Sequence, residues 1–108
     1  MRAAVDDLFR AGYLSYAIVA TGVLVETLLE RGTGADMVEA EAAIDRLADA
    51  LVGEGLVAGE IWLLRLRALL ARARGDEAAA YRDYRDRYRD MAISLGFEGH
   101  MKWAEAMP

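Results

Sequence analysis

His100 is the only histidine of the chain and the side chain best suited to acid–base chemistry. An imidazole can act as a general base, but catalysis needs a second group within hydrogen-bond reach. An enzyme would therefore require a pocket that holds His100 beside a carboxylate such as Glu98 or Glu105. The sequence contains no cysteine, no serine in a nucleophile motif and no GxxxxGK[ST] phosphate loop. We therefore predict no catalytic residues and no enzymatic activity, and we interpret His100 as a packed histidine near the chain end.

A row of carboxylates at helical spacing, Glu41, Asp45 and Asp49, is the best candidate for binding a metal ion. A di-metal site in a helical bundle would need Glu-x-x-His pairs on facing helices, and the Glu98-Gly99-His100 segment has the wrong spacing. Surface carboxylates more often form a solvated face. We predict such a face, meeting the arginines of a neighbouring helix, with no metal and no cofactor.

An aromatic stripe, Tyr81, Tyr84 and Tyr88, continues in Met91 and Leu95 at helical spacing. It is either a binding surface or a core stripe whose phenol tips reach water, and the core interpretation is favoured because helices ordinarily bury one such face. The candidate interaction surface of the whole chain consists of its prominent aromatic residues. They are Tyr13, Tyr16, Trp62, Tyr81, Tyr84, Tyr88 and Trp103.

The charges between these tyrosines, in YRDYRDRYRD, predict i,i+4 ion pairs from Asp83 to Arg87 and from Arg82 to Asp86. This face is typical of a solvated helix surface. It resembles an arginine-rich RNA-binding tract only superficially, because the aspartates cancel the positive field. The net charge of −5 also disfavours nucleic acid, since phosphate binding needs a basic surface.

The element that carries this stripe is the second of two helices joined at Gly75-Asp76, where glycine ends one helix and aspartate caps the next. The first helix, over 57–74, has two apolar faces separated by two strips of arginine. The wide face comprises Trp62, Leu63, Leu66, Leu69, Leu70 and Ala73, and the narrow face comprises Leu64, Ala68 and Ala71. We predict a helix that is packed on both sides, as stacked helical repeats require.

The N-terminal half predicts further helices. Residues 2–10 form an amphipathic helix with Val5, Leu8 and Phe9 on one side, which Gly12 is expected to end. A second apolar helix follows over 13–30, with an expected joint at Thr21-Gly22. The segment ends at 32–34.

Asp36 and Glu39 have the spacing of a capping box at the start of a third helix. That helix is expected to reach about Leu51 by its apolar periodicity. The residues expected to be buried on it are Met37, Ala40, Ile44, Leu47, Ala48 and Leu51. With 53–55 as a loop, the whole chain is expected to form about six helices, arranged as a right-handed stack of antiparallel helix pairs.

Length and composition indicate one all-α domain over 1–108, with a hydrophobic fraction of 56%. The uncharged run 11–25 is about 15 residues long, shorter than a membrane span needs, so we expect a buried helix and no membrane partner. The first residues, MRAAVDDLFR, lack the apolar core of a signal peptide, and the absence of cysteine is consistent with a reducing compartment. We expect a cytoplasmic location.

A weak internal repeat appears when the chain is shifted by roughly 41 residues. Leu28-Leu29 then aligns with Leu69-Leu70, and Arg31 aligns with Arg72. Two helix-pair units barely make a stable stack, because each unit needs neighbours to cover its apolar faces. We therefore expect a homo-oligomer, formed through a face that includes Tyr13, Tyr16 and the 18–25 strip.

The C-terminal segment RALLARARGDEAAAYRDYRDRYRDMAISLGFEGHMKWAEAMP resembles the end of large actinobacterial signalling proteins. Those proteins combine a class III adenylate/guanylate cyclase domain, an ATPase domain of the AAA or STAND type and a tetratricopeptide-like helical tail. RAAVDDLF, ATGVLVETLLERG and EAEAAIDRLADAL resemble the same tail, while the tetratricopeptide signature of Trp, Leu-Gly, Tyr, Ala and Pro is largely missing. The resemblance implies a short tetratricopeptide-like stack without catalytic residues.

The function predicted from these observations is a non-catalytic module for protein–protein interaction or regulation. Its partner would be another protein or the catalytic domain of a parent protein, in cyclase- or ATPase-coupled signalling. The alternative is a structural homodimeric helical bundle with a role in assembly.

Overall fold

Five α-helices contain most of the residues that the computed structural model describes, which are residues 2–75 and 78–108. They are α1 (Arg2–Arg31), α2 (Gly34–Leu51), α3 (Val57–Arg74), α4 (Ala78–Leu95) and α5 (Glu98–Ala106). No strand occurs in these described ranges. The predicted all-α class is confirmed, and the expected bounds of the helix over 57–74 are correct.

Helix α1 is continuous over 30 residues, so the expected breaks at Gly12 and at Thr21-Gly22 were wrong. Five helices form where about six were expected, because the first two predicted segments are one helix. A glycine inside a helix costs only about 1 kcal/mol relative to alanine, which flanking helix formers and packing can offset. Gly22 also has a packing role, since a Cβ there would lie 3.1 Å from the Trp62 ring. The side chains of Val5, Leu8 and Phe9 lie outside the described residues.

The helix ends follow from local chemistry. Gly32 and Gly75 end α1 and α3 with φ of 71° and 75°, a left-handed conformation that glycine adopts without a Cβ penalty. Thr33 then caps α2, because its hydroxyl accepts from the Asp36 N–H at 3.1 Å while its own N–H donates to the Asp36 carboxylate at 3.2 Å. The capping box is therefore formed by Thr33 and Asp36, three residues before the predicted pair of Asp36 and Glu39. The predicted cap Asp76 lies outside the described residues.

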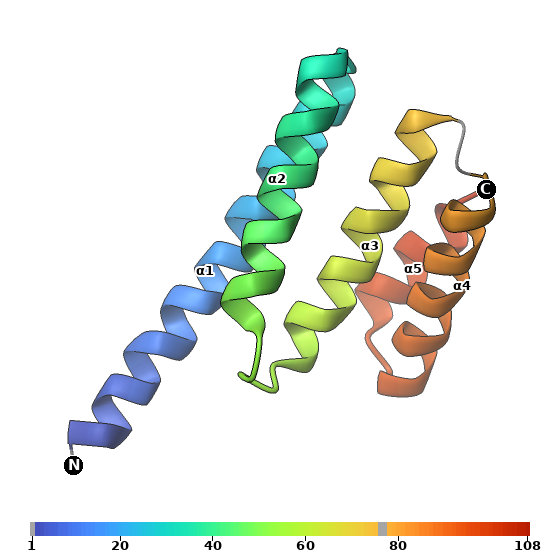
Figure 1. The fold of residues 1–108 in the computed structure, drawn as a ribbon. Helices are drawn as coiled ribbons and strands as arrows, with labels where there is room; N and C mark the ends of the chain where they lie inside the picture. The colour runs from blue at the N-terminus through green and yellow to red at the C-terminus, as the bar shows by residue number, and fades with distance from the viewer. Residues whose placement is uncertain (1, 76–77) are drawn as a thin grey trace.

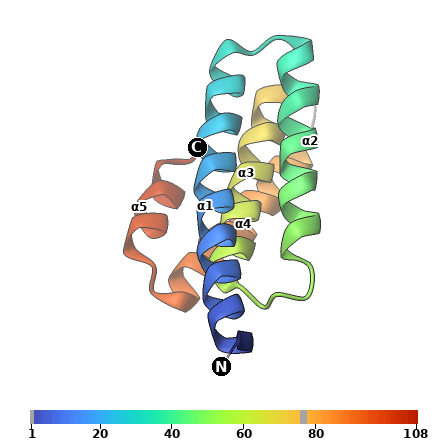
Figure 2. The same cartoon turned by 90° about the vertical axis from the view of Figure 1, so that its left-hand side faces the viewer.

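The helices form two antiparallel hairpins and one additional helix (Figure 1). Helices α1 and α2 lie side by side, α3 packs against both of them, and α4 packs against α3. Helix α5 packs against α4 and stands to one side of the two hairpins in the view of Figure 2. The N-terminal part of α1 extends beyond the end of α2 in both views. The molecule is flat, with extents of 50 × 32 × 20 Å.

Helix α3 lies between two hydrophobic clusters, which confirms the prediction that it is packed on both sides. Leu66 and Leu70 belong to the first cluster, whereas Ile61 and Ala68 belong to the second. Leu69, expected on the wide face, packs against the second cluster. The other members of the first cluster are Leu14, Ile18, Val25, Leu28, Ala40, Ala43, Ile44, Leu47 and Leu51, and those of the second are Tyr88, Ala92, Ala104 and Met107.

The predicted buried face of the third helix is largely confirmed in α2. Ala40, Ile44, Leu47 and Leu51 are buried in the first cluster. Met37 and Ala48 are half-buried. The period of the apolar residues was therefore sufficient to orient this helix.

Candidate interaction surfaces

The seven aromatic residues of the predicted interaction surface lie in two places. Tyr13 and Tyr16 lie on the outer side of α1. Trp62, Tyr88 and Trp103 form an aromatic cluster where α3, α4 and α5 meet, and Tyr81 and Tyr84 pack against the same hydrophobic cluster as Trp62.

The tyrosine stripe of α4 lies largely in the core. Tyr88 is fully buried in the second cluster, and Tyr81, Tyr84 and Met91 pack against that cluster. Leu95, the last residue of the stripe, is exposed at the end of α4. The core interpretation is confirmed for Tyr88, although its phenol does not reach water, and Tyr81, Tyr84 and Met91 are half-buried.

Arg65 is the centre of the aromatic cluster, a role that the sequence analysis missed. Its Nη2 lies 2.6 Å from a carboxylate oxygen of Glu26 in α1. Its guanidinium carbon lies 4.6 Å from the centroid of the Trp103 ring and 5.4 Å from that of Trp62. Nε and Nη1 are buried and donate to no acceptor within the described residues. The two indole faces stabilise a cation whose remaining donors are withdrawn from water.

His100 packs in the same cluster. Its ring meets the rings of Trp62 and Trp103 edge-on, with centroids 5.3 and 5.2 Å apart. Its Nδ1 shares a hydrogen bond of 2.7 Å with the phenol oxygen of Tyr88. The enzymatic interpretation required a carboxylate in this position, and the observed partner is a phenol.

The protonation of this pair follows from burial. Desolvation lowers the pKa of His100, and the nearby positive charge of Arg65 lowers it further. Desolvation raises the pKa of Tyr88 to about 12, although Arg65 acts in the opposite direction. Both side chains are therefore neutral at pH 7, which suits a hydrogen-bonded pair among indole rings.

The signal for this cluster was present in the sequence but was local to each helix. Trp62 precedes Arg65 by one helical turn, and Gly22 precedes Glu26 by one turn. The Trp62 ring fills the space that Gly22 leaves open, and Arg65 then faces Glu26. A tryptophan–arginine pair on one helix facing a glycine–glutamate pair on another is recognisable only when the two helices are known to pack together.

The carboxylate row on α2 faces α3. Glu41 forms an ion pair with Arg74, and Asp45 lies 3.8 Å from Arg67. This confirms that arginines of a neighbouring helix meet the row. Among the described residues, no three His, Cys, Asp or Glu side chains gather where they could hold a metal ion.

A groove runs along α3; it is lined by α2, α3 and α4 at one end and by α3 and α4 at the other. It consists of two hollows of about 250 and about 450 Å³, both lined by Arg67 and Tyr84. Apolar side chains contribute to the lining and charged side chains of both signs surround them. The other lining residues are Glu41, Ile44, Leu70, Ala71 and Arg74 in the first hollow, and Glu60, Leu63, Leu64, Arg87 and Met91 in the second.

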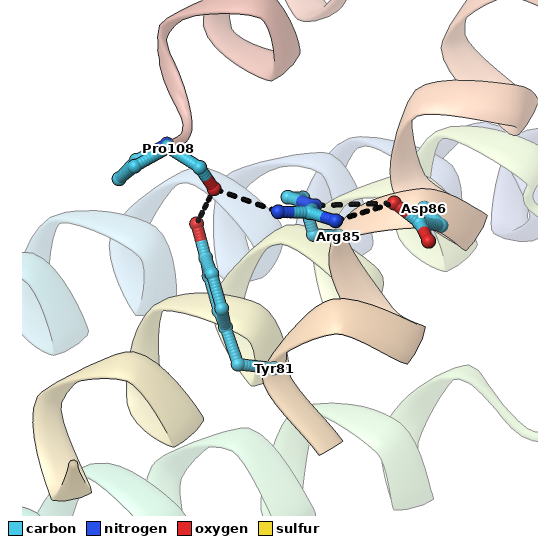
Figure 3. A network of polar contacts seen from close by, with 4 residues as sticks. All are labelled: Tyr81, Arg85, Asp86 and Pro108. Carbon is cyan, nitrogen blue, oxygen red and sulfur yellow. Dashed lines mark hydrogen bonds and ion pairs between the residues drawn. The ribbon is translucent and has the colours of Figure 1, made fainter. Parts of the chain in front are cut away.

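The end of the described chain returns to α4 (Figure 3). The main-chain oxygen of Pro108 accepts hydrogen bonds from the Tyr81 hydroxyl at 3.1 Å and from Arg85 at 2.9 Å. Arg85 also bonds Asp86 at 3.1 Å, so Asp86 pairs with its neighbour and not with Arg82 as predicted. The other predicted pair, Asp83 with Arg87, is present at 3.4 Å.

The outer side of α1 is apolar and exposed. Tyr13, Tyr16, Val19, Val23 and Leu24 are 67%, 72%, 56%, 61% and 38% exposed, and we call these five residues the α1 face. By length and composition alone, the segment Gly12–Arg31 is apolar enough to cross a membrane.

No protein-family model, no curated protein and no solved structure matches this chain.

Proposed function

We propose that this chain is a non-catalytic, protein-binding regulatory module in which tetratricopeptide-like helix hairpins are stacked. The observation that carries the proposal is the double packing of α3, whose two sides are covered by two different hydrophobic clusters. Stacking of this kind produces extended surfaces between neighbouring hairpins, and such surfaces are used for binding. The module would act in the cytoplasm.

The groove along α3 is the surface that we assign to the partner. It has the composition of a protein interface, with apolar residues such as Leu63 and Met91, an aromatic residue, Tyr84, and arginines at the rim. The partner is a protein segment with apolar side chains that fit into this groove along α3. The resemblance of the tail to cyclase–ATPase regulators favours a segment of such a catalytic protein.

The test is direct binding to purified class III cyclase and ATPase domains of an actinobacterial regulator encoded with or beside this chain, by isothermal titration calorimetry. Arg87→Ala removes a charge from the groove, together with an exposed ion pair of small value and the contact of the guanidinium with the Tyr84 ring, whose centroid lies 5.8 Å away. We expect it to weaken binding by about fivefold or more, equivalent to about 1 kcal/mol.

Arg82→Ala is the matched control, because Arg82 lies on the same helix and is exposed. It should change the affinity less than twofold if the groove is the binding surface. Equal effects of the two substitutions would contradict the assignment of the groove. Absence of binding by the unsubstituted chain to either domain would contradict the proposed function.

A further inference from the structure

The α1 face forms a continuous apolar strip on one side of a helix whose opposite side is buried. Tyr16, Val19 and Val23 follow one another at helical spacing, and no charged residue occurs between Arg10 and Glu26. Leu14, Ile18, Val25 and Leu28 on the other side belong to the first cluster, so core packing fixes which side of α1 points outward. The expected 18–25 contact strip is thereby corrected, since Ile18 and Val25 are in the core.

A second copy of this chain fits this face by area. The exposed parts of the five side chains amount to roughly 500 Å² per copy, so a symmetric pair that covered them fully would bury roughly 1,000 Å² before flanking residues are added. That area reaches the lower limit of specific interfaces. A two-fold axis lets the same strip cover itself, which needs no other partner.

Charge favours an antiparallel arrangement of the two α1 helices. A parallel pair would place the exposed Glu30 side chains of the two copies against each other, and like charges in contact are destabilising. An antiparallel pair centred between Val19 and Ala20 would separate them. In that register Tyr16 faces Val23 of the second copy, and Tyr13 faces Glu26 of the second copy, where its hydroxyl can donate to the carboxylate.

A membrane suits this face less well. A spanning α1 would have to leave the first cluster and break the 2.6 Å pair between Glu26 and Arg65. Helices that lie on a membrane surface are usually rich in lysine and arginine on their polar side, which attract anionic lipid. The segment 12–30 contains no basic residue, and the whole chain carries a charge of −5.

We propose that two copies of this chain associate through the α1 face, antiparallel and about a two-fold axis. This interface is separate from the groove along α3 and does not depend on the function proposed for it. The two proposals therefore fail independently. Loss of self-association leaves binding in the groove intact, and the reverse also holds.

Sedimentation equilibrium from about 1 to about 500 µM tests the association of the full chain. We expect a reversible dimer that Val23→Glu weakens at least tenfold, because the substitution buries a charge in the interface. Val23 is exposed and glutamate is a good helix former, so the variant should retain its fold, which circular dichroism verifies. Val38→Glu is the matched control, because Val38 is an exposed valine on α2, outside the α1 face. It should leave the dimer unchanged.

The orientation is tested by disulfide trapping, since the chain has no cysteine of its own. Chains with Gly12→Cys and chains with Thr27→Cys should form a mixed disulfide with each other in the antiparallel pair. A Thr27→Cys homodisulfide formed in preference would overturn the antiparallel arrangement.

A monomer at all concentrations would overturn the proposal. So would a monomer that binds vesicles of phosphatidylcholine and phosphatidylserine and loses this binding on Val23→Glu.

Discussion

At the scale of single residues, His100 and Arg65 illustrate how an aromatic environment controls charge. The indoles of Trp62 and Trp103 surround both side chains, yet they stabilise Arg65 as a cation and favour the neutral form of His100. The difference arises because Arg65 has Glu26 as a counter-ion, whereas burial lowers the pKa of His100 and the like charge of Arg65 lowers it further.

This arrangement predicts a pH dependence of stability. The pKa of His100 is lowered in the folded state, so below the unfolded-state value of about 6.5 the unfolded chain binds the proton more readily. The stability that neutral His100 contributes to the folded state is fully present above about pH 6.5 and is lost as the pH falls through the folded-state pKa. We expect the free energy of unfolding, measured by urea denaturation, to decrease from about pH 7.5 to about pH 5.

His100→Gln provides the control for this prediction, because glutamine can bond Tyr88 but does not titrate in that range. Its stability should change less with pH over the same window. The carboxyls of Asp36 and Glu54 have lowered pKa values and titrate below the window. A slope that persists unchanged in His100→Gln would contradict the assignment.

At the scale of elements, α1 shows that the same residue type can have different roles along one helix. Gly12 is exposed, and a Cβ there would meet open space, whereas Gly22 is buried against Trp62. Trp62 cannot move away easily, because His100, Trp103 and Arg65 hold its ring on other sides.

Alanine at these two positions should therefore have opposite effects. Gly12→Ala should stabilise the protein by about 0.5–1 kcal/mol, since alanine is the better helix former. Gly22→Ala should destabilise it by about 1 kcal/mol, because the new methyl group would lie 3.1 Å from the Trp62 ring. Thermal unfolding of both variants measures the difference. Equal stabilisation by both would show that the contact with Trp62 does not constrain α1.

At the scale of the whole molecule, α3 joins the two hydrophobic clusters, and Trp62 packs against both. A helix shared in this way couples the α1–α2 hairpin to α4 and α5. The molecule should therefore unfold as one cooperative unit, although it is flat and its two clusters are distinct.

Ile44→Ala tests this coupling, because Ile44 is buried in the first cluster on α2, a helix that packs against α1 and α3 but not against α4 or α5 in the described residues. We expect a loss of about 2–4 kcal/mol, typical of truncating a buried isoleucine. Far-UV circular dichroism and the fluorescence of Trp62 and Trp103 should report the same unfolding midpoint. Val38→Ala on the exposed side of α2 should cost less than about 0.5 kcal/mol. Fluorescence that persists after the helical signal has fallen would indicate two independent units.

Much of the fold could be predicted from the residues alone, because the relevant interactions are local. The apolar period oriented α2, the two apolar faces of α3 anticipated its double packing, and glycine with positive φ ended α3 at the expected position. The candidate surface was predicted less well. An aromatic side chain can be buried in the core or exposed for binding, so the residue type alone does not say which. Tyr88 is in the core and Tyr16 is at the surface, although both are tyrosines.

By itself, therefore, the sequence of this protein determined the all-helical class, the bounds of α3, the inward side of α2 and the two apolar faces of α3, since these depend on residues within a few positions of one another. Only the tertiary structure decided that Gly22 continues α1, that Arg65 pairs with Glu26 and that His100 bonds Tyr88. These contacts join helices that are distant along the chain. Their partners are set by how the helices pack, and helical spacing within one segment carries no information about the residue that faces it.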